Sequence, residues 1–130
     1  MDYESGVKTH PKFRMWLRPD GIVQMAWVAL ADIRLEDAIA AIQAMTELTG
    51  GRLSPLLVDL HDSGQQARAA RLEFTSQADL VSAVALIVGT PLSRIMGNFF
   101  LGVSRPPYPV RMFDTEESAL VWLNEFVVSR

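Results

Sequence analysis

The sequence predicts an α/β fold: a single domain built on a mixed, mostly parallel sheet, with a β-hairpin near its N-terminus and four helices. Three observations support this prediction. The chain has 130 residues, 49% of them hydrophobic and 21% charged, which suits one compact globular domain. Beyond residue 32, short apolar runs alternate with segments of helical periodicity. A helix then separates each strand from the next, which favours parallel strands joined by right-handed crossovers.

The N-terminal part is expected to contain a tail and a hairpin. Residues 1–11 are polar and irregular, so we expect a flexible tail there and a folded domain over residues 12–130. Two β-patterned runs follow, Phe13–Leu17 and Ile22–Leu30, on either side of Pro19-Asp20-Gly21. Proline presets φ, aspartate can bond to nearby backbone and glycine accepts positive φ, so this tripeptide predicts the turn of a β-hairpin.

The middle of the chain predicts a helix, a strand and a second helix. Apolar residues recur at helical spacing over residues 35–48, and Gly50-Gly51 marks the end of that helix. Residues 55–60 predict a short apolar strand. A second helix is expected over Gln65–Phe74, with Asp62 and Gln65, or Ser63 and Gln66, as its capping box.

The C-terminal half repeats this alternation. Residues 81–88 form a nearly continuous apolar run, which is typical of a central parallel strand buried on both faces. Thr90 and Pro91 then predict the N-cap and first residue of a helix that extends to Val103. Residues 110–113 predict a short strand, and the acidic residues 114–117 a cap for the last helix. The expected order is β-β-α-β-α-β-α-β-α.

Composition excludes several classes of activity. The chain has no cysteine, so thiol nucleophiles, disulfides and cysteine-ligated metals are absent. It has only two histidines, and its net charge of −3 argues against nucleic-acid binding. No Walker loop or Gly-x-Gly-x-x-Gly motif is present. The longest apolar stretch is too short to span a bilayer, and no signal peptide is evident. We therefore expect a cytoplasmic protein with no metal, no cofactor and no insertion into membranes.

Polar side chains gather after the strand at residues 55–60, where open α/β sheets bind ligands. Five of them are candidates for an interaction or anion-binding surface: Asp59, His61, Asp62, Ser63 and Arg68. The helix N-terminus expected there would favour an anion. Simple capping and solvation explain the same residues and are the favoured interpretation. A hydrolytic triad of Asp59, His61 and Ser63 is disfavoured, because neighbours on one short turn cannot form the required line of groups.

A second strand-to-helix turn lies beside the first in the predicted sheet. Thr90, Ser93 and Arg94 could extend an anion site along the sheet edge, although a capped helix accounts for them too. The following helix carries Phe99 and Phe100, which make it more apolar than one buried face requires. These two side chains are candidates for an apolar interface or the wall of a pocket, although core packing is the favoured explanation.

The element order, the strand Leu56–Asp59, the turn Asp62-Ser63-Gly64 and the ending at residues 113–123 carry a family resemblance. Over residues 12–128 the chain resembles the SpoIIAA-like, or STAS, proteins, which include bacterial anti-sigma-factor antagonists. In the antagonists, a partner kinase phosphorylates a serine at the start of a helix, and Ser63 matches that serine. The loop before Ser63 is shorter here and contains a single serine.

The resemblance and the missing catalytic motifs together predict a non-enzymatic bacterial regulatory module that acts by protein–protein contact. A homodimer and a regulatory protein partner are expected, with Ser63 as the phosphorylation site. The alternative is a carrier of a small apolar ligand or lipid, because some relatives of this fold bind such molecules.

Overall fold

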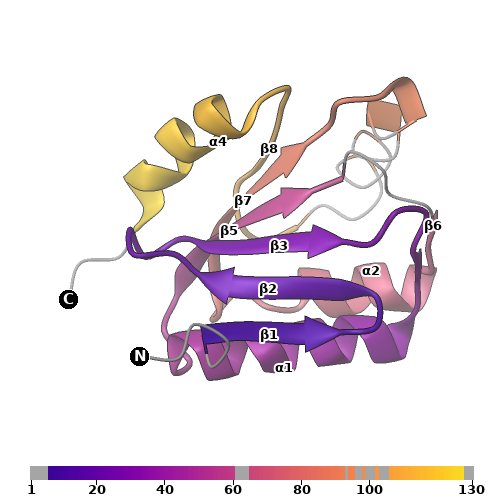
Figure 1. The fold of residues 1–130 in the computed structure, drawn as a ribbon, viewed down its shortest axis with the longest axis horizontal. Helices are drawn as coiled ribbons and strands as arrows, with labels where there is room; N and C mark the ends of the chain where they lie inside the picture. The colour runs from indigo at the N-terminus through magenta and orange to yellow at the C-terminus, as the bar shows by residue number, and fades with distance from the viewer. Residues whose placement is uncertain are drawn as a thin grey trace.

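The computed structural model describes residues 6–60, 65–92, 94–95, 98, 102 and 106–127. At its centre is a six-stranded sheet of order β1-β2-β3-β5-β7-β8 (Figure 1). Its strands are β1 (Val7–His10), β2 (Phe13–Leu17), β3 (Val23–Trp27), β5 (Ser54–Asp59), β7 (Val81–Ile87) and β8 (Val110–Phe113). The first three strands pair antiparallel, and β3, β5, β7 and β8 pair parallel. The predicted mixed, mostly parallel sheet with an N-terminal hairpin is confirmed.

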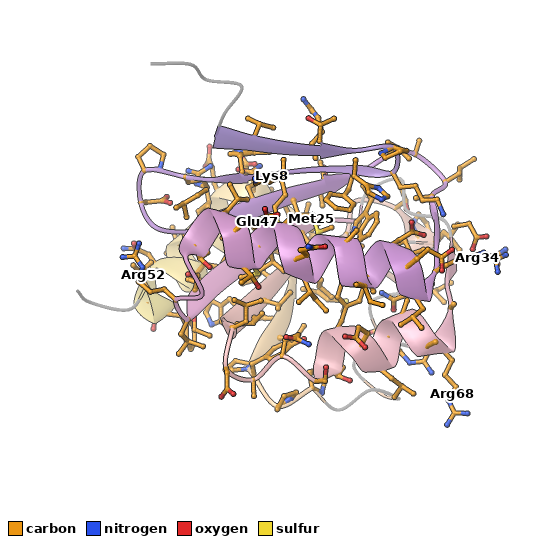
Figure 2. The ribbon with its side chains drawn as sticks, turned by 90° about the horizontal axis from the view of Figure 1, so that it is seen from below. Lys8, Met25, Arg34, Glu47, Arg52 and Arg68 are labelled. Carbon is orange, nitrogen blue, oxygen red and sulfur yellow. The ribbon has the colours of Figure 1, made fainter. Side chains whose placement is uncertain are left out.

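Helices cover both faces of this sheet. On one face lie α1 (Leu35–Thr49) and α2 (Arg68–Thr75), side by side, as Figure 2 shows from below. The other face carries α4 (Glu116–Leu123), followed by the short 3-10 turn η2 (Asn124–Phe126). The predicted helix after β7 lies mostly outside the described residues. Its described members, residues 91–92, 94–95, 98 and 102, are helical, and the helical conformation starts directly after Thr90.

The predicted turn of the hairpin is present between β2 and β3. The backbone N–H of Ile22 donates to the Asp20 carboxylate over 3.1 Å, as expected for an aspartate that bonds local backbone. Gly21 adopts φ +88°, and a Cβ there would lie 3.1 Å from Val127. Glycine is therefore favoured both by the backbone conformation and by the close approach of the C-terminal segment.

The prediction of a flexible tail over residues 1–11 is wrong for Val7–His10, which form β1. This strand pairs antiparallel with β2, from Val7 opposite Trp16 to His10 opposite Phe13. Lys8 and Glu47 form an ion pair of 3.8 Å that links β1 to α1. Pairing with β1 supplies hydrogen-bond partners to the backbone of β2, which would otherwise be an exposed edge strand. The polar composition of residues 7–10 does not reveal this stabilisation.

The predicted start of α2 is also wrong, and with it the capping box. Gln65–Gln66 form a short strand, β6, parallel to β4 (Asp32–Ile33). The N–H groups of Gln65 and Ala67 donate to the carbonyls of Ala31 and Ile33. Because this pairing keeps the backbone extended, α2 starts only at Arg68, and its N-cap Ala67 makes no side-chain cap. The predicted capping residues Asp62 and Ser63 lie outside the described residues.

Within the described residues, no helix is both long enough and apolar enough to cross a membrane.

Candidate functional site: an apolar cavity under α2

A cavity of about 90 Å³ lies on the sheet face that α1 and α2 cover. Neighbouring strands supply most of its wall, because alternate residues of a strand point to the same face. Its lining consists of Met25, Trp27, Ile33, Leu56, Val58, Leu60, Gln66, Phe74, Val84, Leu86 and Tyr108. Nine of these eleven side chains are apolar, so the cavity offers a surface for an apolar guest.

Aromatic rings form one side of this cavity. Trp27, the last residue of β3, meets Phe74 of α2 edge to face, with ring centroids 6.4 Å apart. Phe13 lies behind Trp27 at 5.2 Å, also edge to face, and stacks in turn on His10 at 4.5 Å. Such pairs contribute about 0.5–1.5 kcal/mol beyond their area burial, so this row makes a firm wall from β1 to α2.

Tyr108 closes the cavity from the segment before β8. Its hydroxyl donates to the Phe74 carbonyl over 2.9 Å, which ties this segment to the C-terminal half of α2. Burial raises the pKa of Tyr108 to about 12. The phenol therefore stays protonated at neutral pH and keeps its hydrogen bond.

An ionic cluster around the buried side chain of Asp37 lies at the other end of the aromatic row. The Asp37 carboxylate accepts from Lys12 Nζ at 2.7 Å and from the Arg34 N–H at 2.9 Å, and His10 Nε2 lies 4.0 Å away. Burial acts to raise the pKa of Asp37, but hydrogen bonds from Lys12 and Arg34 and the charge of Lys12 lower it below its ordinary value. The cluster fastens the β1–β2 turn to the start of α1.

The two strand-to-helix turns predicted as a site do share one sheet edge. Asp59 ends β5 opposite Ile87 of β7, and the Leu60 N–H donates to the Ile87 carbonyl. Asp59 is exposed, and Thr90 is half-buried. The carboxyl ends of β5 and β7, from which the two turns start, are therefore adjacent.

Two cationic candidates lie within the described residues, and the anion site itself stays a prediction. Arg68 is exposed at the first turn of α2 and points away from the fold (Figure 2). Arg94 is also exposed, and its guanidinium forms an ion pair with Asp114. The remaining candidates lie outside the described residues: His61, Asp62, Ser63, Ser93, Phe99 and Phe100. Over the part of the chain described here, no cluster of three His, Asp or Glu side chains suits a metal ion.

Sequence reasoning missed the cavity and the ionic cluster. Tyr108, Asp37 and Trp27 are not among the candidate site residues that the sequence predicts. No spacing in the sequence relates Tyr108 to Phe74, since their contact joins positions 34 residues apart.

Fold and site together define a SpoIIAA-like α/β domain with an apolar cavity on one face of its sheet. The fold is shared with a solved structure, an uncharacterized protein of the DUF3478 family with a SpoIIAA-like fold from Shewanella loihica PV-4. That match has a TM-score of 0.59 and 15% identity, and covers 91% of this chain and 90% of the other.

Residues 15–127 match the family described as domain of unknown function DUF7793, and the chain belongs to this family. A protein of unknown function from Arthrobacter sp. FB24 is 34% identical, over 84% of this chain and 96% of that one, with a TM-score of 0.34. No curated protein matches the chain.

Proposed function

We propose that this protein is a non-enzymatic binding protein that holds a small apolar molecule, or the apolar end of a larger one, in the cavity under α2. The observation that carries the proposal is the 90 Å³ space walled by apolar side chains of β3, β5 and β7. This corresponds to the ligand-carrier alternative among the functions that the sequence predicts.

The energetic cost of the cavity supports this proposal. At about 24 cal/mol per Å³, an enclosed empty space of 90 Å³ costs about 2 kcal/mol of stability, and this is an upper value for a cavity that is partly open to solvent. That is a large part of the roughly 5–15 kcal/mol by which a domain is stable. Larger side chains at Val58 or Val84 would remove this cost. A guest that fills the space offsets it, which gives a physical reason for keeping small residues there.

The volume limits what the guest can be. An apolar cavity of about 150 Å³ binds benzene, so a space of 90 Å³ suits a group somewhat smaller than one ring. A whole lipid or a drug-sized molecule does not fit inside. The expected guest is a short hydrocarbon group, with any polar portion of the molecule lying outside the cavity.

The polar groups in the lining support binding rather than chemistry. Gln66 does not titrate, and the Tyr108 hydroxyl already donates to a backbone carbonyl and has a pKa of about 12. Neither group can act as a general base near neutral pH. A bound guest would meet van der Waals contacts and one amide.

The alternative function, a regulatory module that docks a protein partner, stays a prediction. Its key residues, His61, Asp62 and Ser63, lie outside the described residues. The expected homodimer and the phosphorylation of Ser63 likewise stay predictions.

Tryptophan fluorescence offers a direct test, because Trp27 lines the cavity while Trp122 packs on Phe113 on the opposite face. In a Trp16→Phe/Trp122→Phe variant, Trp27 is the one remaining tryptophan and reports occupancy. Titration with n-butanol, whose alkyl chain is smaller than one ring, should change its emission saturably. Native mass spectrometry of gently purified protein should show a bound small molecule.

A cavity-filling pair of variants supplies the control. Val58→Phe places a ring in the cavity and should abolish the response, whereas Val121→Phe makes the same change at a side chain on α4 that is 74% exposed and should leave it intact. Equal responses in the two variants, or no saturable response in the parent, would overturn the proposal.

A further inference from the structure

A second cavity adjoins the first. It measures about 30 Å³ and lies on the same face of the sheet, toward the start of β7. Its lining consists of Met15, Met25, Ala41, Ile42, Met45, Leu56, Phe74, Gln77, Leu80, Val81 and Tyr108. Four of these residues also line the first cavity: Met25, Leu56, Phe74 and Tyr108. The two spaces are therefore neighbours that share part of their walls.

The two cavities follow one another along the strands. The first extends to Trp27 and Leu60, at and just beyond the carboxyl ends of β3 and β5. The second extends to Val81, the first residue of β7. Val84, in the first cavity, lies three residues further along β7, a distance of roughly 10 Å in a strand. The two spaces therefore lie one after the other along the direction of the strands.

The wall between the cavities has a fixed side and an adaptable side. Tyr108 and Phe74 are held together by the hydrogen bond of the tyrosine hydroxyl to the Phe74 carbonyl. Met25 belongs to β3 and lies next to α1 in Figure 2. Its side chain is a flexible thioether. Two further methionines, Met15 and Met45, line the second cavity. Methionine fills irregular space and readily changes rotamer, so this side can yield to a guest.

We propose that the guest carries an unbranched hydrocarbon chain whose end passes between Met25 and Tyr108 into the second cavity, which thereby sets the longest chain that is bound. This inference rests on the proposed binding function. It adds the shape of the ligand, a linear chain and not a ring, and it names Val81 and its neighbours as the residues that determine chain length.

The test is a series of n-alkan-1-ols from propanol to nonanol, titrated against the full chain with Trp27 as the reporter. Each methylene that becomes buried should tighten binding about fourfold, until the second cavity is full and further carbons add nothing. Cyclohexanol should bind more weakly than n-hexanol, because a ring cannot pass between Met25 and Tyr108.

The same substitution, valine to isoleucine, at two positions of β7 distinguishes the roles of the two cavities. Val81→Ile adds a methylene at the second cavity, so the affinity gain should stop at least one carbon earlier while the shortest alcohols bind as before. Val84→Ile adds the same group at the first cavity and should weaken alcohols of every length. The change is small, and thermal unfolding of both variants verifies that they remain folded.

The outcomes distinguish the two proposals. If alcohols bind but the affinity gain stops at the same length in the parent and in Val81→Ile, the chain-length inference is wrong and the binding function stands. If cyclohexanol binds as well as n-hexanol, the linear path is wrong too. If no alcohol binds, the binding function itself fails, and this inference fails with it.

Discussion

The two faces of the sheet are built from the same strands yet pack in different ways. Along β7, Ala83 and Ala85 face α4 and are fully buried, while Val84 and Leu86 face the side of α1 and α2. The alanines allow α4 to approach closely, and Leu123 of that helix is also fully buried. On the opposite face, longer aliphatic, aromatic and methionine side chains border both cavities. Small residues thus give a tight face, and large irregular ones leave space that a guest can use.

Two adjacent leucines on β5 provide the largest expected difference in stability between the two faces of the sheet. Leu57 is fully buried on the α4 face, whereas Leu56 is half-buried and borders both cavities. Leu57→Ala should cost about 4 kcal/mol of unfolding free energy, because it opens a new cavity in a tight contact. Leu56→Ala should cost about 2 kcal/mol, since its side chain already lacks some neighbours. Urea unfolding measures both, and equal costs would contradict the difference between the faces.

The contacts of the Asp37 carboxylate lead to a prediction that depends on pH. Asp37→Asn should cost about 2 kcal/mol at neutral pH, because two hydrogen-bond donors lose their charged acceptor. The folded pKa of Asp37 lies below its ordinary value of 3.8, so the unfolded chain binds the proton more readily. Its stabilising contribution is therefore complete above about pH 4 and is lost as the pH falls through the folded pKa.

Urea unfolding of the parent and the Asn variant at several pH values between 2 and 7 measures this contribution. The gap in stability between the two proteins should narrow below pH 4. A constant gap across that range would show that the carboxylate charge does not stabilise the contact.

Larger side chains on β7 test the same difference between the two faces by adding volume instead of removing it. Ala85→Val should destabilise by about 1–2 kcal/mol, because the α4 face has no room for two more carbons. Val84→Ile, one residue earlier, should leave stability unchanged or slightly raised, since the added methylene enters the first cavity. Differential scanning calorimetry measures the stability of both variants. A greater loss of stability in Val84→Ile than in Ala85→Val would contradict this prediction.

The smallest effect is expected in the loop that follows β3. Leu30 has φ +57°, in the left-handed region, and its side chain is 75% exposed. That conformation costs a leucine about 1–2 kcal/mol, and glycine avoids it at an entropic cost of about 0.5–1 kcal/mol. Leu30→Gly should therefore raise the free energy of unfolding by about 0.5 kcal/mol. A loss greater than 1 kcal/mol would show that the leucine side chain makes a stabilising contact.

Local patterns in the sequence determined most of the secondary structure. The apolar run that became β7, the helical spacing of α1 with its Gly50 end, and the Pro19-Asp20-Gly21 turn each depend on neighbours within a few positions. The same patterns showed that β5 and β7 would place their carboxyl ends at one edge. These features could be predicted because periodicity and turn chemistry act over short distances.

The remaining features depend on contacts between distant parts of the chain. Val7–His10 became a strand because β2 offered an edge, and Gln65–Gln66 stayed extended because Asp32–Ile33 lay beside them. The buried carboxylate of Asp37 needed Lys12, 25 residues away, and Tyr108 needed Phe74. The cavity was the least predictable feature. A sequence pattern states which face of an element is apolar, but a cavity is the volume left over once distant elements have packed.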